Sequence, residues 1–166
     1  MAGPVERDEI VETQVFTEEM VLVTAAEFRS FNEAVRSSQR VNILVLRTGC
    51  SYRTRLERLL KDAGVASFGQ LEFGTIDGIF GCAREGLGIT MMPRLLSERA
   101  SQYGKLGIHA LPRHEALVPT MFIRRKDAVM SAALRRFVEC ALASAASATT
   151  PPVGKIKRQT KLSKIA

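Results

Sequence analysis

A short polar segment, residues 48–52, carries the side chains of this sequence that are best suited to hold a small ligand. Its five members are Thr48, Gly49, Cys50, Ser51 and Tyr52. The segment follows an apolar run that predicts a strand, and it precedes apolar residues at helical spacing. At such a junction, free backbone N–H groups and the positive end of the helix dipole favour a small anion or a carbonyl oxygen. We therefore predict a ligand-binding loop here, and an ordinary helix N-cap is the alternative that fits the same pattern.

A second loop of the same kind contains Thr75 and Ile76. It follows the alternating segment 67–73, which reads as a strand, and it opens a second helical stripe. Thr75 is expected to be the N-cap of that helix, and we place both residues in the predicted ligand-binding set. Parallel strands with right-handed crossovers bring successive loops to the carboxyl edge of one sheet, so the two loops are expected to meet there.

The elements that must position these loops form two strand-loop-helix units in tandem. Strands are predicted at 41–46, which is apolar on both faces, at 67–73 and at 89–93, where Pro93 is expected to stop the strand. The helices between them carry apolar stripes made of Leu56, Leu59, Leu60 and Ala63, and of Ile76, Ile79, Phe80, Ala83 and Leu87. This alternation indicates an α/β fold.

The remaining elements are predicted more coarsely. Strands are expected at 20–24, 106–111 and 118–124, and an irregular helical segment at 26–37. The apolar face of a final helix is formed by Leu134, Phe137, Val138, Ala141 and Leu142.

Several of these stretches closely resemble the effector-binding domain of LysR-type transcriptional regulators. The matching motifs are Thr48-Gly-Cys-Ser-Tyr-Arg53, Gly74-Thr-Ile-Asp-Gly78, Gly86-Leu-Gly-Ile89 with Met91-Met-Pro-Arg94, Ala2-Gly-Pro-Val5 and Phe16-Thr-Glu-Glu-Met-Val-Leu-Val-Thr24. The resemblance covers roughly residues 2–143. It implies a fold like the type 2 periplasmic binding proteins, with a small polar or carboxylate effector bound between two lobes.

The same resemblance implies how the chain is divided. Residues 25–117 would form one complete lobe, and residues 1–24 and 118–145 a remnant of the other. The segments near 20–25 and 117–122 would cross between the lobes. A helix-turn-helix is expected to be missing from this chain, so we expect no specific DNA binding by it alone. Apolar edges left by an incomplete lobe would favour self-association.

Composition fits one cytoplasmic domain with no membrane anchor. The chain has 166 residues and 46% hydrophobic content, with no apolar run long enough to span a bilayer. Its three cysteines are widely spaced, so reduced thiols are expected and neither a disulfide framework nor a zinc site is suggested. The two histidines, His109 and His114, lack an evident nucleophile or acidic partner, and Gly86-Leu-Gly88 lacks the third glycine of a dinucleotide loop. We predict no cofactor, no metal and no enzymatic activity.

The net charge of +7 is concentrated at one end of the chain. Five of the charges lie in residues 151–166, which leaves +2 for residues 1–150. This tail, taken from residue 146, is rich in Ala, Ser, Thr, Pro and Lys, and we expect it to be disordered and solvated. It could give only weak, salt-sensitive DNA binding, because it contains nothing that reads base edges.

Cys50 has two competing interpretations. The predicted helix start and the neighbouring Arg47, Arg53 and Arg55 would favour a thiolate, and the resembled family includes a peroxide sensor with a reactive cysteine in a similar loop. The favoured interpretation is a small residue that lines an effector pocket. Cys82 and Cys140 are expected to be structural.

The favoured function is an effector-sensing domain of a LysR-type regulator. The alternatives are a free-standing solute-binding or thiol-based redox-sensing protein of the same fold, and a truncated gene product without function.

Overall fold

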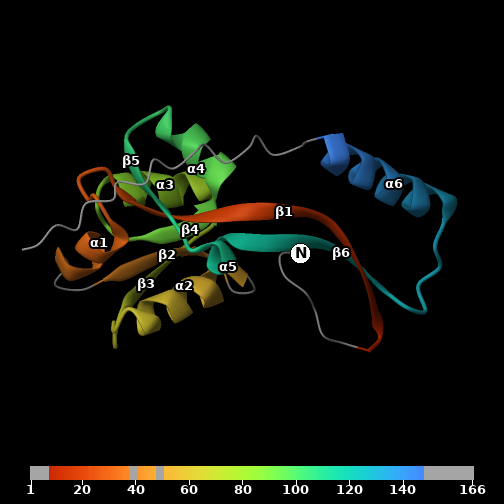
Figure 1. Cartoon of the computed structure of the whole chain (residues 1–166), viewed down its shortest axis with the longest axis horizontal. Coiled ribbons are helices and arrows are strands. Elements are labelled where there is room, and N and C mark those ends of the chain that lie inside the picture. Colours follow the sequence, from red (N-terminus) through yellow and green to blue (C-terminus); the bar gives the residue numbers. More distant parts are fainter. Residues whose placement is uncertain (1–7, 38–40, 48–50, 148–166) are drawn as a thin grey trace, which may run out of the picture. The chain divides into compact units, whose positions relative to one another are not determined.

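The computed structural model describes residues 8–37, 41–47 and 51–147, and it divides the chain into two units, residues 1–130 and 131–166. In the first unit the elements are β1 (Ile10–Ala25), α1 (Phe31–Ser37), β2 (Asn42–Leu46), α2 (Ser51–Asp62), β3 (Gly69–Phe73), α3 (Ile76–Arg84), β4 (Thr90–Pro93), α4 (Arg94–Ser101), β5 (Leu106–Ala110), α5 (Arg113–Ala116) and β6 (Leu117–Arg125) (Figure 1). The second unit contains α6 (Ala132–Ser147).

Strand β1 is the centre of the sheet in the first unit. Its C-terminal half pairs antiparallel with β4 on one side and with β5 on the other. Strands β2 and β3 pair parallel, as the sequence predicted. A single parallel bridge, Ile43 to Ile89, joins β2 to the end of the turn that leads into β4.

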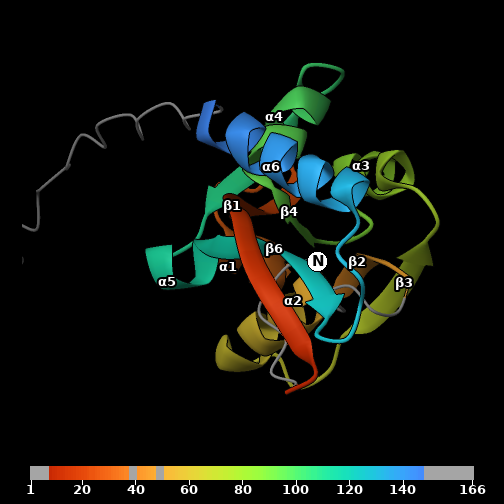
Figure 2. The ribbon, with the colours of Figure 1, turned by 90° about the vertical axis from the view of Figure 1, so that its right-hand side faces the viewer.

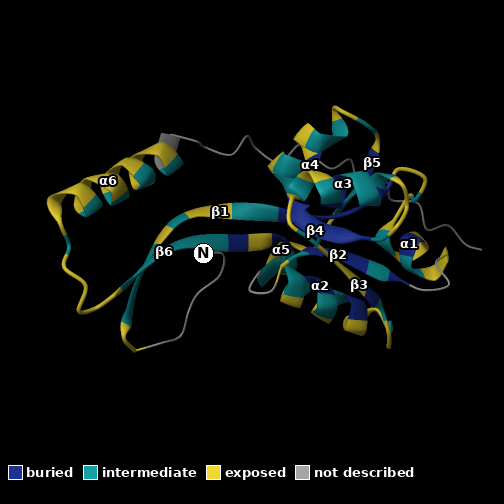
Figure 3. Cartoon of the chain, turned by 180° about the vertical axis from the view of Figure 1, so that it is seen from behind, coloured by how far each residue is buried: buried dark blue, intermediate teal, exposed yellow. Residues whose placement is uncertain are grey.

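Helices cover both faces of this sheet, which explains the continuous apolar runs in its strands. Helix α2 lies on one face, and α3 and α4 lie on the other (Figures 1 and 2). Successive residues of β1 therefore enter different cores: Met20 and Leu22 pack with the α2 residues Leu56 and Leu60, whereas Val21 and Val23 pack with α3. The buried residues gather at this part of the sheet (Figure 3).

Helices α4 and α5 were not predicted. Pro93 was expected to end a strand, and it does so, but it also stands directly before α4 as its N-cap residue. Proline is compatible with the start of a helix because the first N–H groups have no intrahelical partner. Leu95 in this helix is 59% exposed, whereas Leu96 and Ala100 pack against the core on the α3 face of the sheet.

Two glycines bring β4 close to β2. Gly86 has φ +73°, and it turns the chain after α3, where the N–H of Leu87 donates to the carbonyl of Cys82 at 3.0 Å. Gly88 lies against β2 so closely that a Cβ atom would stand 2.6 Å from the carbonyl oxygen of Asn42. The contact permits two backbone hydrogen bonds of 2.9 Å, from Leu44 N to Ile89 O and from Ile89 N to Asn42 O.

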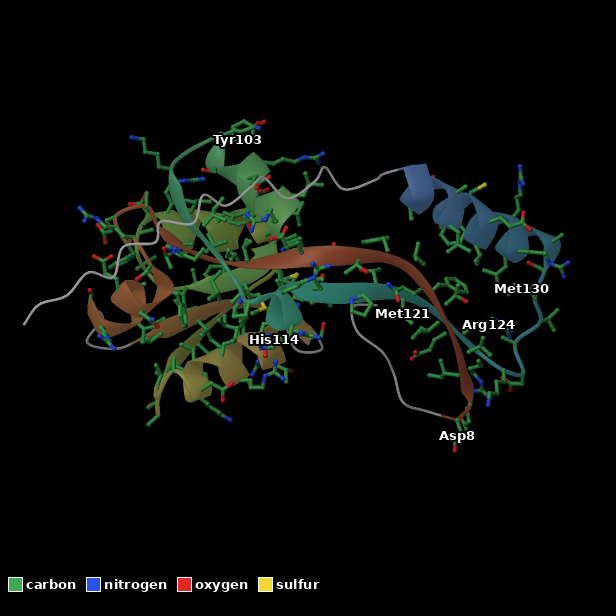
Figure 4. The ribbon with its side chains drawn as sticks, viewed as in Figure 1. Asp8, Tyr103, His114, Met121, Arg124 and Met130 are labelled. Atoms are coloured by element: carbon green, nitrogen blue, oxygen red, sulfur yellow. The ribbon has the colours of Figure 1, made fainter. Side chains whose placement is uncertain are left out.

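The N-terminal half of β1 extends away from β4 and β5, and among the described residues it pairs with β6 alone, so that the two strands form a two-stranded ribbon. The pairing runs antiparallel from Ile10 opposite Arg125 to Glu19 opposite Leu117, with an irregularity between Gln14 and Phe16. This ribbon is much less buried than the rest of β1 (Figure 3), and the labelled Met121 and Arg124 lie along it (Figure 4). Phe16, which lies in this paired segment, is 43% exposed.

Helix α6 confirms the predicted final helix, but not the role predicted for Cys140. Phe137, on the expected apolar face, is 62% exposed, and Cys140 is exposed. The expectation that Cys140 is a structural, buried residue is therefore wrong. An apolar stripe shows which side chains share a helix face, and it does not show what covers that face.

His109 of β5 gives the first unit a predicted pH dependence. Thr24 Oγ1 donates to the carbonyl of Ala25 at 2.9 Å, so the His109 Nε2–H must donate to Thr24 Oγ1 at 2.8 Å. Burial lowers the pKa of His109, and the carboxylate of Glu33 opposes this effect only in part. Above the unfolded-state pKa of about 6.5 the ring is neutral in both states, and as the pH falls below it the unfolded chain takes up the proton first.

Unfolding free energy should therefore decrease as the pH falls from 7.5 to 5.5. Urea denaturation of the wild type and of His109→Gln, which retains a donor but cannot titrate, measures this contribution. The variant is expected to show a shallower pH dependence. Identical dependence in both proteins would show that His109 contributes nothing to it.

Candidate ligand site

A hollow opens where β2 and β4 separate. Beyond the Ile43–Ile89 bridge no further ladder pair joins the two strands within the described residues. The hollow is lined by strand residues 44–46 and 90–92 and by Tyr52, Arg53 and Leu56 of α2. It lies at the carboxyl end of β2 and beside the N-terminus of α2, where parallel α/β structures bind ligands.

Thr90 is the buried polar residue of the hollow. The residue is only 1% exposed, and it comes from the first position of β4. The neighbouring walls are apolar, with Leu44, Val45 and Met91 also buried. Because buried polar groups are nearly always hydrogen-bonded, a hydroxyl in this position is suited to a ligand oxygen or nitrogen.

Tyr52 connects the hollow to the place where the ribbon leaves the sheet. Its hydroxyl donates to Glu18 Oε2 of β1 at 2.6 Å, and Thr120 Oγ1 of β6 donates to the same oxygen at 3.4 Å. The next residue of β1, Glu19, accepts from Arg94 Nη2 at 2.7 Å. This hydrogen bond is the main reason why the pKa of Arg94 is raised. Movement of Tyr52 would therefore disturb hydrogen bonds to β1 and, through Glu18, to β6.

Arg53 brings a cation to the rim of the hollow, but carboxylates already surround it. Its Nε lies 2.9 Å from Glu57 Oε1, and its Nη1 lies 3.0 Å from Glu72 Oε1. The hydrogen bond to Glu57 is the largest cause of the raised pKa of Arg53. The guanidinium group is therefore always charged, and the carboxylates of Glu57 and Glu72 balance its positive charge.

Comparison with known proteins decides the family. The model of the LysR substrate binding domain matches residues 1–146. This chain belongs to the LysR substrate-binding domain family. The HTH-type transcriptional regulator GltR of Bacillus subtilis is 37% identical over 138 residues, which are 83% of this chain and 46% of GltR. YusT of the same organism, an uncharacterised HTH-type regulator, is 40% identical over 124 residues, 75% of this chain and 41% of that protein.

Solved LysR-type regulatory domains share the fold of this chain. The regulatory domain of OxyR2 from Vibrio vulnificus has a TM-score of 0.65 at 14% identity, over 86% of this chain and 68% of that one. The effector binding domain of QuiR has a TM-score of 0.64 at 16% identity, over 88% and 70%. The predicted fold, like the type 2 periplasmic binding proteins, is confirmed. The chain spans less than half the length of GltR and YusT.

The residues predicted from the sequence to bind a ligand do not all lie at the hollow. Tyr52 lines the hollow, and Ser51 is the half-buried first residue of α2 beside it. Thr48, Gly49 and Cys50 lie outside the described residues, so their ligand or redox roles stay predictions. Thr75 is the expected N-cap of α3, with its Oγ1 accepting from Gly78 N at 3.3 Å.

Thr75 and Ile76 do not line the hollow. Ile76 packs instead against the core on the α3 face of the sheet. Arg53 and Thr90 line the hollow, and neither was among the predicted ligand-binding residues. Thr90 had a signal that could have been used, because it is the single polar residue of the apolar run 89–93.

Other kinds of site find little support. Within the part of the chain that the structure describes, no three His, Cys, Asp or Glu side chains gather to hold a metal ion. His114 is exposed on α5 (Figure 4), and it is His109 whose Nε2 is hydrogen-bonded to Thr24. Cys82 packs partly buried against the α3 core, as predicted. The named relatives are transcriptional regulators rather than enzymes. Among the described helices, none combines the length and apolar character needed to cross a membrane.

Proposed function

We propose that this LysR substrate-binding domain senses a small effector that binds at the hollow between β2 and β4, with only its polar oxygen group entering the hollow. The effector carries a carboxylate or a similar polar oxygen group next to a short apolar part. DNA recognition by the whole regulator belongs to the helix-turn-helix region for which the relatives are named. The domain itself contributes the response to the small molecule.

The observation that carries this proposal is the buried hydroxyl of Thr90. In a pocket with apolar walls, a hydroxyl is one of the few groups that can fix the orientation of a ligand through a hydrogen bond. A ligand oxygen or nitrogen that hydrogen-bonds to Thr90 would lie among the buried apolar residues Leu44, Val45 and Met91. The N-terminus of α2 adds a field that favours negative charge.

In the proposed division of the chain, the hollow lies in one lobe and is linked by hydrogen bonds to the strand that crosses to the other lobe. We keep residues 25–117 as the complete lobe, residues 1–24 and 118–145 as the remnant of the other, and residues 146–166 as a solvated tail. The hydrogen bond from Tyr52 to Glu18 joins the complete lobe to the crossing strand. A ligand that repositions Tyr52 shifts the balance between ribbon orientations, which is how binding would reach the rest of a regulator.

Two solved relatives support the ligand class. QuiR was solved in complex with shikimate, and the CcmR regulatory domain of Synechocystis PCC6803 was solved in complex with 2-PG. Both are small molecules held by domains of this fold. Their identities with this chain are 16% and 12%, so they support a small effector and do not identify it.

Replacing Thr90 with valine tests the proposal, because valine keeps the shape of the side chain and removes its hydroxyl. Titration calorimetry against a panel of small carboxylate metabolites would first find a ligand of the wild type. Thr90→Val is then expected to weaken binding about tenfold, the effect of one lost hydrogen bond of roughly 1.4 kcal/mol.

Thr75→Ala is the matched control. It removes a threonine hydroxyl from the other predicted loop, and its loss should cost stability as a lost helix cap, about 1 kcal/mol, with unchanged ligand affinity. Unchanged affinity in Thr90→Val together with a loss in Thr75→Ala would place the site at the α3 loop and refute the hollow.

A further inference from the structure

The guanidinium group of Arg53 has one nitrogen that no carboxylate occupies. Nε donates to Glu57 and Nη1 donates to Glu72, whereas Nη2 makes no hydrogen bond with the described residues. The side chain is 25% exposed and lines the hollow. An incoming oxyanion can therefore reach Nη2 before any existing bond breaks.

The two carboxylates on Arg53 differ in how they are attached. Glu57 lies one turn along α2, so it moves together with Arg53. Glu72 belongs to β3, where it stands opposite Val45 of β2 in the parallel register, and its side chain is 43% exposed. Its Oε1 also accepts from Gln70 Nε2 at 2.7 Å. Glu72 can thus leave Arg53 and keep both a hydrogen bond and contact with water.

We propose that Glu72 is a built-in competitor of the effector, so that an oxyanion group on the ligand takes over Nη1 and engages Nη1 and Nη2 together as a bidentate pair. This inference rests on the proposed function of the hollow. Arginine presents parallel N–H groups that match a carboxylate, which is why a planar oxyanion replaces Glu72 well. A neutral ligand cannot replace the negative charge that Glu72 places beside Arg53. Competition with Glu72 therefore favours anionic effectors over neutral ones.

The exchange is feasible because the ion pair being broken is a partly exposed one. Such pairs contribute little to stability, since water and salt screen them. Release of Glu72 also removes the side-chain tie between the start of α2 and β3. Ligand binding in the hollow would therefore change the contacts of β3 as well as those of Tyr52.

The test uses acetate and sulfate as probes at constant ionic strength, with the full chain labelled for NMR. Signals of residues 52–56 and 90–92 are followed in the wild type, Glu72→Gln, Arg53→Gln and the double variant. Glu72→Gln is expected to tighten oxyanion binding about two- to fivefold, the range of a partly exposed ion pair. In the Arg53→Gln background the same substitution should have no effect.

Glu85→Gln is the control for net charge, because Glu85 is an exposed carboxylate at the end of α3. It is expected to leave oxyanion affinity unchanged. An equal gain in Glu85→Gln and Glu72→Gln, or a gain that persists without Arg53, would overturn the competition. Binding at the hollow with no gain in Glu72→Gln refutes the competition alone, whereas oxyanion shifts that appear only elsewhere refute the proposed site as well.

Discussion

Gly88→Ala is expected to lower the unfolding free energy of this domain by about 2–3 kcal/mol, the upper range for overpacking a well-packed interior. The added Cβ would stand 2.6 Å from the carbonyl oxygen of Asn42 and 2.9 Å from a methyl carbon of Leu44. The carbonyl belongs to the backbone, so it cannot rotate away. To relieve the contact β4 must move from β2, which breaks the two hydrogen bonds around Ile89. Urea denaturation measures the loss.

Gly81→Ala is the matched control for this prediction. Gly81 lies within α3, and a Cβ there would meet nothing within 4 Å. Alanine should stabilise the helix by roughly 0.5–1 kcal/mol, because glycine loses more conformational entropy on folding. If both alanine variants changed stability in the same direction, the close approach of β4 to β2 would not be as described.

Ile79→Ala is expected to cost about 2–5 kcal/mol, the usual range for removing a large aliphatic side chain from a core. Ile79 is fully buried on the face of α3 that packs against the sheet. Leu87→Ala should change stability by no more than about 0.5 kcal/mol, because Leu87 is 51% exposed.

These two variants test a point on which sequence reasoning was partly wrong. Ile79 and Leu87 were predicted to share one inward stripe, but α3 ends at Arg84 and Leu87 follows the turn at Gly86. Helical spacing no longer applies after such a turn. Comparable losses in both variants, measured by thermal and urea denaturation, would contradict the exposure of Leu87.

The elements with strong local patterns were predictable from the sequence. Strand β2 and the apolar stripe of α2 were found because a strand buried on both faces must be continuously apolar and an amphipathic helix must carry a stripe, whereas Ser51 and Tyr52, predicted in the loop, belong to α2. The first half of β1 was not found, since residues 10–19 mix charged and apolar residues without a clear period. Its pairing with β6 is set by a partner about a hundred positions away, which no local pattern encodes.

The sequence indicated where the hollow lies but not which residues line it, and its ligand-binding role stays a prediction. The loop before α2 was expected at the carboxyl edge of β2, and Tyr52 does line the hollow there. Thr90 and Arg53 join it because β4 returns beside β2 after a whole helix has intervened, and because Glu72 reaches Arg53 from β3. These are relations between elements, so they emerge only from the folded chain.

A crystal structure of this chain with an effector identified by calorimetry tests the central claim most directly. We expect the ligand between β2 and β4, with a polar atom within hydrogen-bond distance of Thr90 Oγ1 and an anionic group facing Arg53. A ligand that lies elsewhere and makes no contact with Thr90 or Arg53 would contradict the assignment of this hollow as the effector site.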